Sequence, residues 1–255
     1  MAENNFFQKI RQLPQNVWAV SLTSFLNDIS SEMVINILPL FLSNVLGVKT
    51  NIIGVIEGVA EATASLLKVF SGWLSDKLGG RKWIAVAGYG ISTLSKPFFY
   101  IANSWGMIAG VRWADRLGKG VRTAPMDALV ADSIKPEQRG IAFGFHRAAD
   151  TGGAMVGILI AALAVWLAQS NSLQLGENTF RTVVLISLIP AVLAVISLAT
   201  IARDIPKSGE TEAPKITFKE LGKPFLIFLF IVGLFDPVSY THLRAHETVL
   251  DLVCR

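Results

Sequence analysis

The sequence is poor in charged residues and has almost no cysteine. Only 16% of its 255 residues are charged, whereas soluble globular domains carry about 25%. Apolar residues make up 52% of the chain, and the mean hydropathy is +0.50 over the whole length, so one anchor on a soluble domain does not explain the excess. The single cysteine, Cys254, cannot form an internal disulfide or a paired thiol site. Composition therefore excludes redox chemistry and indicates a membrane protein.

Positive charge is modest, and nucleotide-binding motifs are missing. The formal net charge is +4, and the lysines and arginines form short clusters between apolar runs. This pattern suits the loops of a membrane protein better than a nucleic-acid-binding face. The sequence has no Walker motif for ATP. We expect neither a nucleic-acid partner nor a metal or other cofactor.

Apolar windows long enough to cross a bilayer recur along the chain. A helix needs about 20 residues to cross the hydrocarbon core, and only helices can be this apolar for this long without leaving backbone groups unpaired in lipid. The windows are residues 17–46, 52–74, 83–102, 105–130, 141–168 and 180–201. The sequence therefore predicts an all-α, polytopic integral membrane protein in which residues 17–201 form a bundle of six transmembrane helices.

The lysines and arginines near the ends of these spans predict the orientation of the chain. With residues 1–16 in the cytoplasm, the inner segments hold twelve lysines and arginines, whereas the outer loops hold Lys49 and, at the edge of a span, Arg181. We therefore expect a cytoplasmic N-terminus. Residues 202–223 mix charged residues with proline and glycine, which is typical of a cytoplasmic linker.

The C-terminal part changes character twice. Residues 224–236 begin a seventh transmembrane helix, but the apolar run of 12 residues is about 18 Å long as a helix and too short for a core of about 30 Å. Residues 237–255 hold the only cysteine and two of the three histidines. This tail resembles translated sequencing-adaptor sequence and is predicted to be non-native. The alternative is a genuine short cytoplasmic or interfacial tail.

Acidic residues lie inside the predicted spans, where ionisable groups are costly and usually face a polar cavity or one another. Asp28, Glu32 and Asn36 are spaced four residues apart, as are Glu57 and Glu61 in the second span, so each set shares one helix face. A carboxyl group in such a cavity can exchange a proton or bind a cation such as sodium. Asp28, Glu32, Glu57 and Glu61 are therefore candidates for proton coupling, with Asn36 among the cavity residues.

The fourth and fifth spans add further ionisable residues. Those of the fourth span fall within about 100° of arc at 3.6 residues per turn, and we expect all these stripes to share one water-filled cavity. The cations would either neutralise the acids or hold an anionic group of the substrate, with Arg112 and Arg116 near it. The candidates are Arg112, Asp115, Arg116, Lys119, His146, Arg147 and Asp150.

Two structural explanations compete with that prediction. Arg112, Asp115 and Arg116 could form a purely structural ion network, with His146 as its cap. Charges closer to the span ends can extend to the membrane interface, and we expect this of four residues. They are Arg122, Asp127, Asp132 and Arg139.

The segment between the second and third spans carries a motif. Residues 72–82 read GWLSDKLGGRK, which resembles the signature loop of the major facilitator superfamily, G-x-x-x-D-[RK]-x-G-[RK]-[RK], with Gly80 where a basic residue is usual. RWADRLGKGVRTAP at 112–125 is similar to the arginine motif of the fourth helix. The fifth span is rich in glycine but has Ile158 where the antiporter motif has proline. NDISSEM and RTAPMDALVADS resemble an uncharacterised prokaryotic branch.

The motif residues predict a latch that can break between two conformations. Gly72 permits close helix approach, and Asp76 could face the positive N-terminal end of a neighbouring helix. Gly79 allows a tight turn, after which Arg81 could pair with an acid at the inner end of the fourth span. The alternative is that these cations serve only to set the topology. The latch residues are Gly72, Asp76, Lys77, Gly79, Arg81, Lys82, Asp127 and Asp132.

The resemblance covers about residues 17–236 and implies the N-terminal half of a twelve-helix transporter with the start of helix seven. It implies alternating-access transport of a small solute, coupled to protons or another cation, in a prokaryotic cytoplasmic (inner) membrane. The implied partners are the lipid bilayer, a small-molecule substrate and the missing C-terminal half. The alternatives are a non-transporting membrane sensor or partner subunit and, less favoured, a membrane-embedded enzyme using His146 with Asp150.

Overall fold

The computed structural model describes residues 8–168, 175–205 and 227, and within them the chain forms helices and short connections without a strand. Six helices have 21 to 30 residues, which confirms the all-α prediction. The elements are α2 (Gln15–Ile35), α3 (Leu38–Asn44), α4 (Thr50–Leu78), α5 (Arg81–Ile101), α6 (Trp105–Asp132), η1 (Pro136–Gln138), α7 (Arg139–Ala168) and α8 (Glu177–Ile201). Apart from residue 227, the predicted seventh helix 224–236 lies outside the described residues, as do the linker beyond residue 205 and the tail 237–255.

The first apolar window is not one helix. The sequence predicts a single span over residues 17–46, but α2 ends at Ile35 and α3 begins at Leu38. Pro39 lies in the first turn of α3, and proline has no N–H with which to continue the hydrogen bonding of α2. The break therefore follows from one proline that the apolar count does not register.

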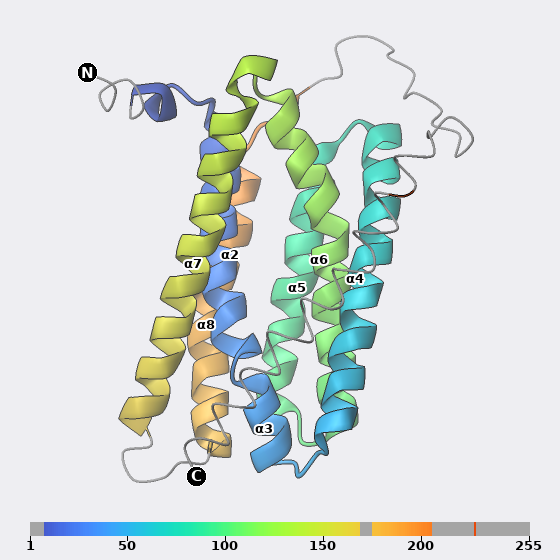
Figure 1. Ribbon diagram of the computed structural model, residues 1–255, viewed down its shortest axis with the longest axis vertical. Helices are drawn as coiled ribbons and strands as arrows, with labels where there is room; N and C mark the ends of the chain where they lie inside the picture. The colour runs from blue at the N-terminus through green and yellow to red at the C-terminus, as the bar shows by residue number, and fades with distance from the viewer. Residues whose placement is uncertain (1–7, 169–174, 206–226, 228–255) are drawn as a thin grey trace. The chain divides into compact units, whose positions relative to one another are not determined.

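The long helices run alternately in opposite directions, so their ends gather in two groups (Figure 1). Side-chain contacts tie one group together. Asn16 at the start of α2 donates hydrogen bonds to Ser133 Oγ and to the carbonyl of Arg203, both at 3.0 Å. Arg81 at the start of α5 lies 2.9 Å from Asp132 at the end of α6. The segments predicted to be cytoplasmic therefore share one end of the bundle.

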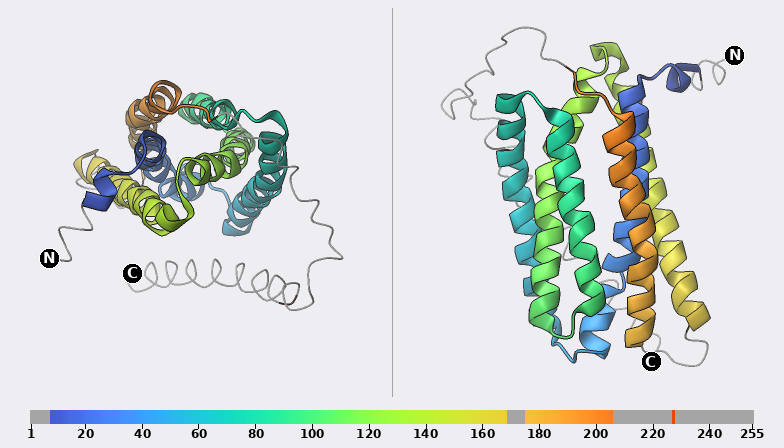
Figure 2. Two further views of the ribbon diagram at one scale, coloured as in Figure 1. Left: turned by 90° about the horizontal axis from the view of Figure 1, so that it is seen from above. Right: turned by 180° about the vertical axis from the view of Figure 1, so that it is seen from behind.

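The helices pack as two similar sets of three. α2 contacts α7 and α8, α6 contacts α4 and α5, and α5 contacts α8 (Figure 2). α2 in one set corresponds to α6 in the other, α7 to α4 and α8 to α5, and corresponding helices have corresponding neighbours. Internal repeats of this kind are common in transporter folds. The repeat leaves one face of α2 and one face of α6 directed at each other across the bundle.

By length and apolarity, three described stretches could each cross a membrane: Gln15–Asn44, Pro136–Ala168 and Glu177–Ile201. α4, α5 and α6 reach the required length but not the same apolarity, because they carry buried or half-buried charges. That α4, α5 and α6 also cross the membrane, which would give six crossings in all, therefore remains a prediction.

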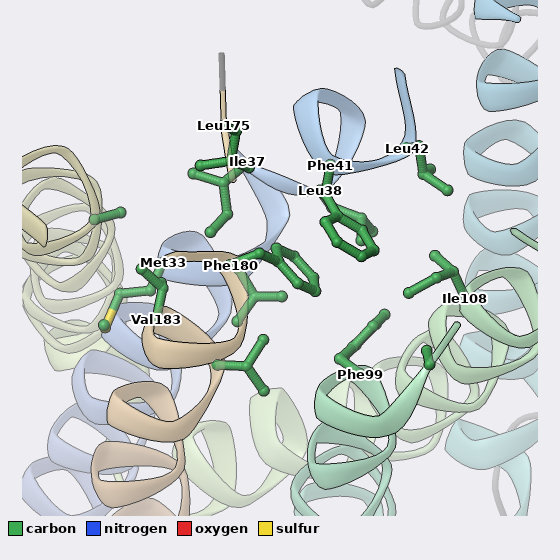
Figure 3. Packing of buried hydrophobic residues seen from close by; sticks show 14 of the residues in the cluster. Met33, Ile37, Leu38, Phe41, Leu42, Phe99, Ile108, Leu175, Phe180 and Val183 are labelled. Atoms are coloured by element: carbon green, nitrogen blue, oxygen red, sulfur yellow. The ribbon is translucent and has the colours of Figure 1, made fainter. Parts of the chain in front are cut away.

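Two apolar clusters fill opposite ends of the bundle and leave a polar layer between them. One joins α3 to the ends of α2, α5 and α8 (Figure 3), and there the rings of Phe41 and Phe180 stack with centroids 4.0 Å apart. The other contains Val17, Tyr89 and Leu129. In between, Thr23 bonds Ser197 at 2.8 Å. The latch residues lie at one end of the bundle, whereas most of the predicted cavity residues lie in this middle layer.

Small residues of α7 bring it directly against α2. A Cβ atom at Gly157 would lie 2.5 Å from the carbonyl oxygen of Ile29, and one at Gly153 would collide with the carbonyl of Phe25. Real Cβ atoms do not approach that closely, so glycine is required at both positions for this packing. The contact fixes the α7 wall of the site relative to α2.

Candidate functional site

An open cavity of about 180 Å³ lies between α2, α6 and α7. Its lining is dominated by ionisable and hydroxyl-bearing side chains, which is unusual inside an apolar bundle. α2 supplies acids, α6 supplies mainly cations and α7 supplies one of each. The ionisable lining residues on these helices are Asp28, Glu32, Asp115, Arg116, Lys119, Arg122, Arg147 and Asp150.

The expectation of one cavity shared by all the polar stripes is corrected in part. Seven of the twelve predicted coupling and cavity residues line it, but α4 packs on the far side of α6. The acids of α4 consequently face α6 rather than the cavity. The five predicted residues outside the lining are Asn36, Glu57, Glu61, Arg112 and His146.

Arg112 and Glu57 form a buried ion pair between α6 and α4. Arg112 Nε lies 3.0 Å and 3.1 Å from the two carboxylate oxygens of Glu57, and Arg112 Nη2 donates to Oε2 at 2.7 Å. Only 1% of the Arg112 side chain and 12% of the Glu57 side chain are exposed. Arg112 Nη1 also reaches Asp115 at 3.4 Å. This arginine is thus fully engaged within the protein, and the structural-network alternative fits it better than contact with substrate.

Arg116 repeats the arrangement one turn further along α6. Its Nε lies 3.3 Å from Glu61 Oε2, and the Glu61 side chain is 41% exposed. Two arginines of α6 are therefore paired with two acids of α4 at the same spacing of four residues. Because Arg116 also borders the cavity, this second pair links the α4–α6 contact to the cavity wall.

Lys96 on α5 is a buried cation that the sequence analysis did not select. It is 2% exposed, and its Nζ donates to Ser30 Oγ and, at 3.4 Å, to Ser31 Oγ on α2. Lys96, Arg112 and Asp115 border a void of about 10 Å³, which is near the size of one water molecule. Lys96 is the only charged residue in the window 83–102, so the rule applied to the other spans would have identified it.

Contrary to the prediction, the Arg122 side chain does not extend outward toward the membrane interface. It is 7% exposed, donates to Ser92 Oγ at 2.8 Å and has its guanidinium 4.4 Å from the centroid of the Tyr89 ring. A Cβ atom on Gly88 would lie 2.7 Å from Arg122 Cβ, so α5 and α6 are too close for the side chain to turn outward. Asp132 and Arg139 are exposed and Asp127 is half-buried, and an interfacial position stays a prediction for these three residues.

α7 contributes an acid with two basic neighbours. Arg147 Nη1 donates to Asp150 Oδ2 at 3.2 Å, and His146 Nε2 lies 3.9 Å from the same oxygen. His146 is fully buried, and within the described residues neither ring nitrogen has a hydrogen-bond partner. Arg147 is exposed toward the cavity, so the wall formed by α7 has no net charge from this pair.

The two acids of α2 have only amide partners. Asn27 Nδ2 donates to Asp28 Oδ1 at 3.1 Å, and the exposed Asn36 Nδ2 donates to Glu32 Oε2 at 3.0 Å. Among the described residues, no ion pair involves Asp28 or Glu32. Both line the cavity, so they are free to meet a proton, a cation or a ligand.

The motif between α4 and α5 builds a three-residue ion cluster. Arg81 lies 3.3 Å from Asp76 and 2.9 Å from Asp132, which is one of the two acids expected as its partner. Gly79 ends α4 with φ +69°, a conformation that favours glycine. Gly72 faces Ala124 of α6, where an added Cβ would lie at 3.3 Å.

The remaining latch residues lie at the same end with other contacts. Lys77 and Lys82 lie over the rings of Trp73 and Trp83, each at 5.1 Å, and the backbone N–H of Lys82 donates to Asp204 at 3.4 Å. Asp127 is half-buried, and within the described chain it forms no ion pair with the motif.

The sequence model of the Major Facilitator Superfamily matches residues 20–246. The chain is 32% identical over 244 residues to an uncharacterized MFS-type transporter of Methanocaldococcus jannaschii, covering 94% of this chain and 59% of that protein. It is also 30% identical over 168 residues to an uncharacterized protein of Mycobacterium tuberculosis, covering 66% of this chain and 39% of that protein.

Solved transporters share the fold at low sequence identity. A POT family transporter in complex with a thioalcohol-conjugated peptide superposes with a TM-score of 0.65 at 14% identity, covering 93% of this chain and 50% of that one. A bacterial homologue of the lysosomal transporter Spinster gives 0.61 at 19% identity, with 75% and 44% covered. The chain shares its fold with these solved transporters, and it belongs to the Major Facilitator Superfamily. It spans 59% of the archaeal relative and about half of these solved transporters.

Proposed function

We propose that this bundle is the N-terminal half of a secondary active transporter that moves a small charged solute by alternating access. The observation that carries the proposal is the open cavity bordered by ionisable groups of α2, α6 and α7. Transporters of this kind bind solute near the middle of the bilayer, between two rocking bundles. A second six-helix half, placed against this cavity, would complete the site.

Proton coupling through Asp28 or Glu32 extends the proposal. Both carboxyl groups face the cavity and have only amide partners, so a change in their protonation would change the cavity charge without first breaking an ion pair. Sodium could use the same acids. Glu57 and Glu61, by contrast, are held by arginines, and we assign them to the α4–α6 contact. Arg112 is assigned to that contact as well, in place of substrate binding.

The orientation also remains a proposal. The end of the bundle that holds Lys77, Arg81 and Lys82 is expected to face the cytoplasm of a prokaryotic cell, because positive residues favour that side. The ion cluster at this end would act as the latch, closing when α4, α5 and α6 converge and opening when the two halves rock. In this cluster Arg81 contacts both Asp76 and Asp132, which lie on different helices.

Alternating access predicts that one cavity position can be reached from both sides of the membrane. Thr123 lines the cavity on α6, and its hydroxyl only donates to the carbonyl of Lys119 at 2.7 Å, so cysteine should be tolerated there. In full-length protein without other cysteines, Thr123→Cys should react with a membrane-impermeant maleimide added to either side of oriented vesicles.

The matched control is Leu94→Cys on α5, whose native side chain is 72% exposed on the outside of the bundle. A thiol in hydrocarbon ionises poorly and should react from neither side. Reaction of Thr123→Cys from one side only, under every condition of pH and added solute, would contradict alternating access.

Replacing Asp76 by asparagine should slow transport without preventing membrane insertion. The change removes the charge that Arg81 contacts at 3.3 Å while keeping the shape, so the two conformations lose a contact that distinguishes them. Initial uptake rate and the amount of inserted protein are the two measurements. Lys135→Gln, at an exposed position between α6 and α7 and outside the motif, is the control and should leave the uptake rate unchanged. A normal uptake rate in Asp76→Asn would reduce the motif to a topology signal.

A further inference from the structure

We propose that the cavity binds a zwitterionic solute, with its anionic group at Lys119 and Arg122 on α6 and its cationic group at Asp28 and Glu32 on α2. The inference rests on the proposed transport function and names the substrate class of that same site. The observation behind it is that charges of opposite sign occupy opposite walls of one cavity without pairing.

The α2 wall is acidic. Asp28 and Glu32 lie one helical turn apart, and their hydrogen bonds come from Asn27 and Asn36. Amide donors orient a carboxylate but leave its charge uncompensated. Ser31 borders the cavity between them. This wall can accept hydrogen bonds from an ammonium group while keeping a net negative charge toward the cavity.

The α6 wall is basic. Arg122 is positioned by Ser92 and by the face of Tyr89, both of which are neutral. A cation over an aromatic face is held in place, but its full charge remains available to an anion. Lys119 is one turn away, and its side chain is exposed at the cavity. Arginine with a neighbouring lysine suits a carboxylate or a phosphonate.

The two walls interact without closing on each other. Asp28, Lys119 and Arg122 line the same cavity, yet among the described residues neither of the two cations is within 4.0 Å of an acid. Opposite charges at this separation are bridged best by a molecule that carries both. A ligand with one charge would satisfy one wall and leave the other uncompensated in a site of restricted hydration.

The other charges of the cavity are already paired. Arg147 pairs with Asp150, Arg116 with Glu61, and Asp115 with Arg112. The charged residues of the described lining that lie outside these pairs are two acids on α2 and two cations on α6. The unpaired set therefore has no net charge, as expected for a site that binds a neutral but dipolar molecule.

The inference can be tested by thermal unfolding of the purified full-length protein with matched probes. The probes are α-amino acids with apolar side chains, their methyl esters, which are cations, and their N-acetyl derivatives, which are anions. We expect at least one amino acid to raise the unfolding temperature at concentrations at least tenfold lower than either of its derivatives. Preference for a single-charge derivative, or stabilisation by no amino acid in the set, would overturn the inference.

Two variants test the assignment of each wall. Lys119→Gln should weaken the amino acid at least tenfold and make the methyl ester the better ligand, because a cation is no longer repelled. Asp28→Asn should shift preference toward the N-acetyl derivative. Lys135→Gln, at an exposed position before η1 and outside the cavity lining, is the control and should keep the wild-type order. Lys119 is exposed, so Lys119→Gln should fold even if changes at the buried Arg122 do not.

Failure here is distinguishable from failure of the transport proposal. If Thr123→Cys reacts from both sides but the probes prefer one charge, the protein alternates and only the zwitterion assignment is wrong. If the cysteine reacts from one side only while amino acids still stabilise the protein, the site binds zwitterions but transport is the claim that fails.

Discussion

Glu57→Gln is expected to destabilise the bundle by about 3–5 kcal/mol, the usual cost of leaving a buried charge without its partner. Arg112 makes three contacts of 2.7 to 3.1 Å with the Glu57 carboxylate, and its side chain is 1% exposed. In the variant, Asp115 still borders the same void as the buried cations Arg112 and Lys96, but one carboxylate cannot neutralise both. Reversible unfolding in mixed detergent micelles measures the loss.

The double variant Glu57→Gln with Arg112→Gln should recover most of the lost stability, because it leaves Lys96 and Asp115 balanced. The coupling energy from the complete cycle isolates the pair from the cost of each substitution. Glu61→Gln is the matched control on the same helix. Its side chain is 41% exposed and its partner Arg116 borders the open cavity, so water can hydrate the charge that is left and we expect about 1 kcal/mol or less. A loss for Glu57→Gln no larger than that of Glu61→Gln would contradict the buried pair.

The helices could largely be predicted from the sequence because apolar length determines them. The predicted windows 83–102 and 105–130 differ from α5 and α6 by two residues at most at either end. The first window failed because the count of apolar residues does not include the hydrogen-bonding defect of Pro39. Gly79 and Gly80 likewise mark the turn between α4 and α5 where the motif indicates one.

The neighbours of each polar face could not be predicted in the same way. Arg112 and Lys119 are seven residues apart and share a face of α6, yet one contacts Glu57 on α4 and the other borders the cavity. Seven residues correspond to about 10 Å along a helix axis, over which crossing helices separate and neighbours change. Periodicity gives the direction of a side chain but not which helix lies there at that depth.

The position of Arg122 could not be predicted from the sequence either, because it depends on how closely two helices pack. Its distance from the end of α6 permits an interfacial position, and only the close approach at Gly88 prevents it. That approach joins α5 to α6 and involves residues more than thirty positions apart. Close contacts of this kind depend on both helices together, so neither segment alone predicts them.

The carboxyl groups of Asp28 and Glu32 are expected to determine, through their protonation, the side of the membrane to which the cavity opens. If protonation of these carboxyl groups biases the transporter between its two conformations, the accessible side of the cavity must depend on pH. Coupling energies of this type are about 1–3 kcal/mol, which is at least about fivefold in population. Neutral variants imitate the protonated state, so Asp28→Asn with Glu32→Gln should remove that dependence. In transport, the same variants should lose accumulation driven by a pH gradient and retain exchange.

The measurement that tests this most directly is the ratio of labelling of Thr123→Cys from the two sides of the membrane at pH 6 and pH 8. Taking the ratio cancels the effect of pH on the thiol itself. We predict that the ratio changes about fivefold or more in the otherwise wild-type protein. In the double variant the ratio should be the same at both pH values. A ratio that changes equally in both proteins would contradict the assignment of Asp28 and Glu32 as the coupling groups.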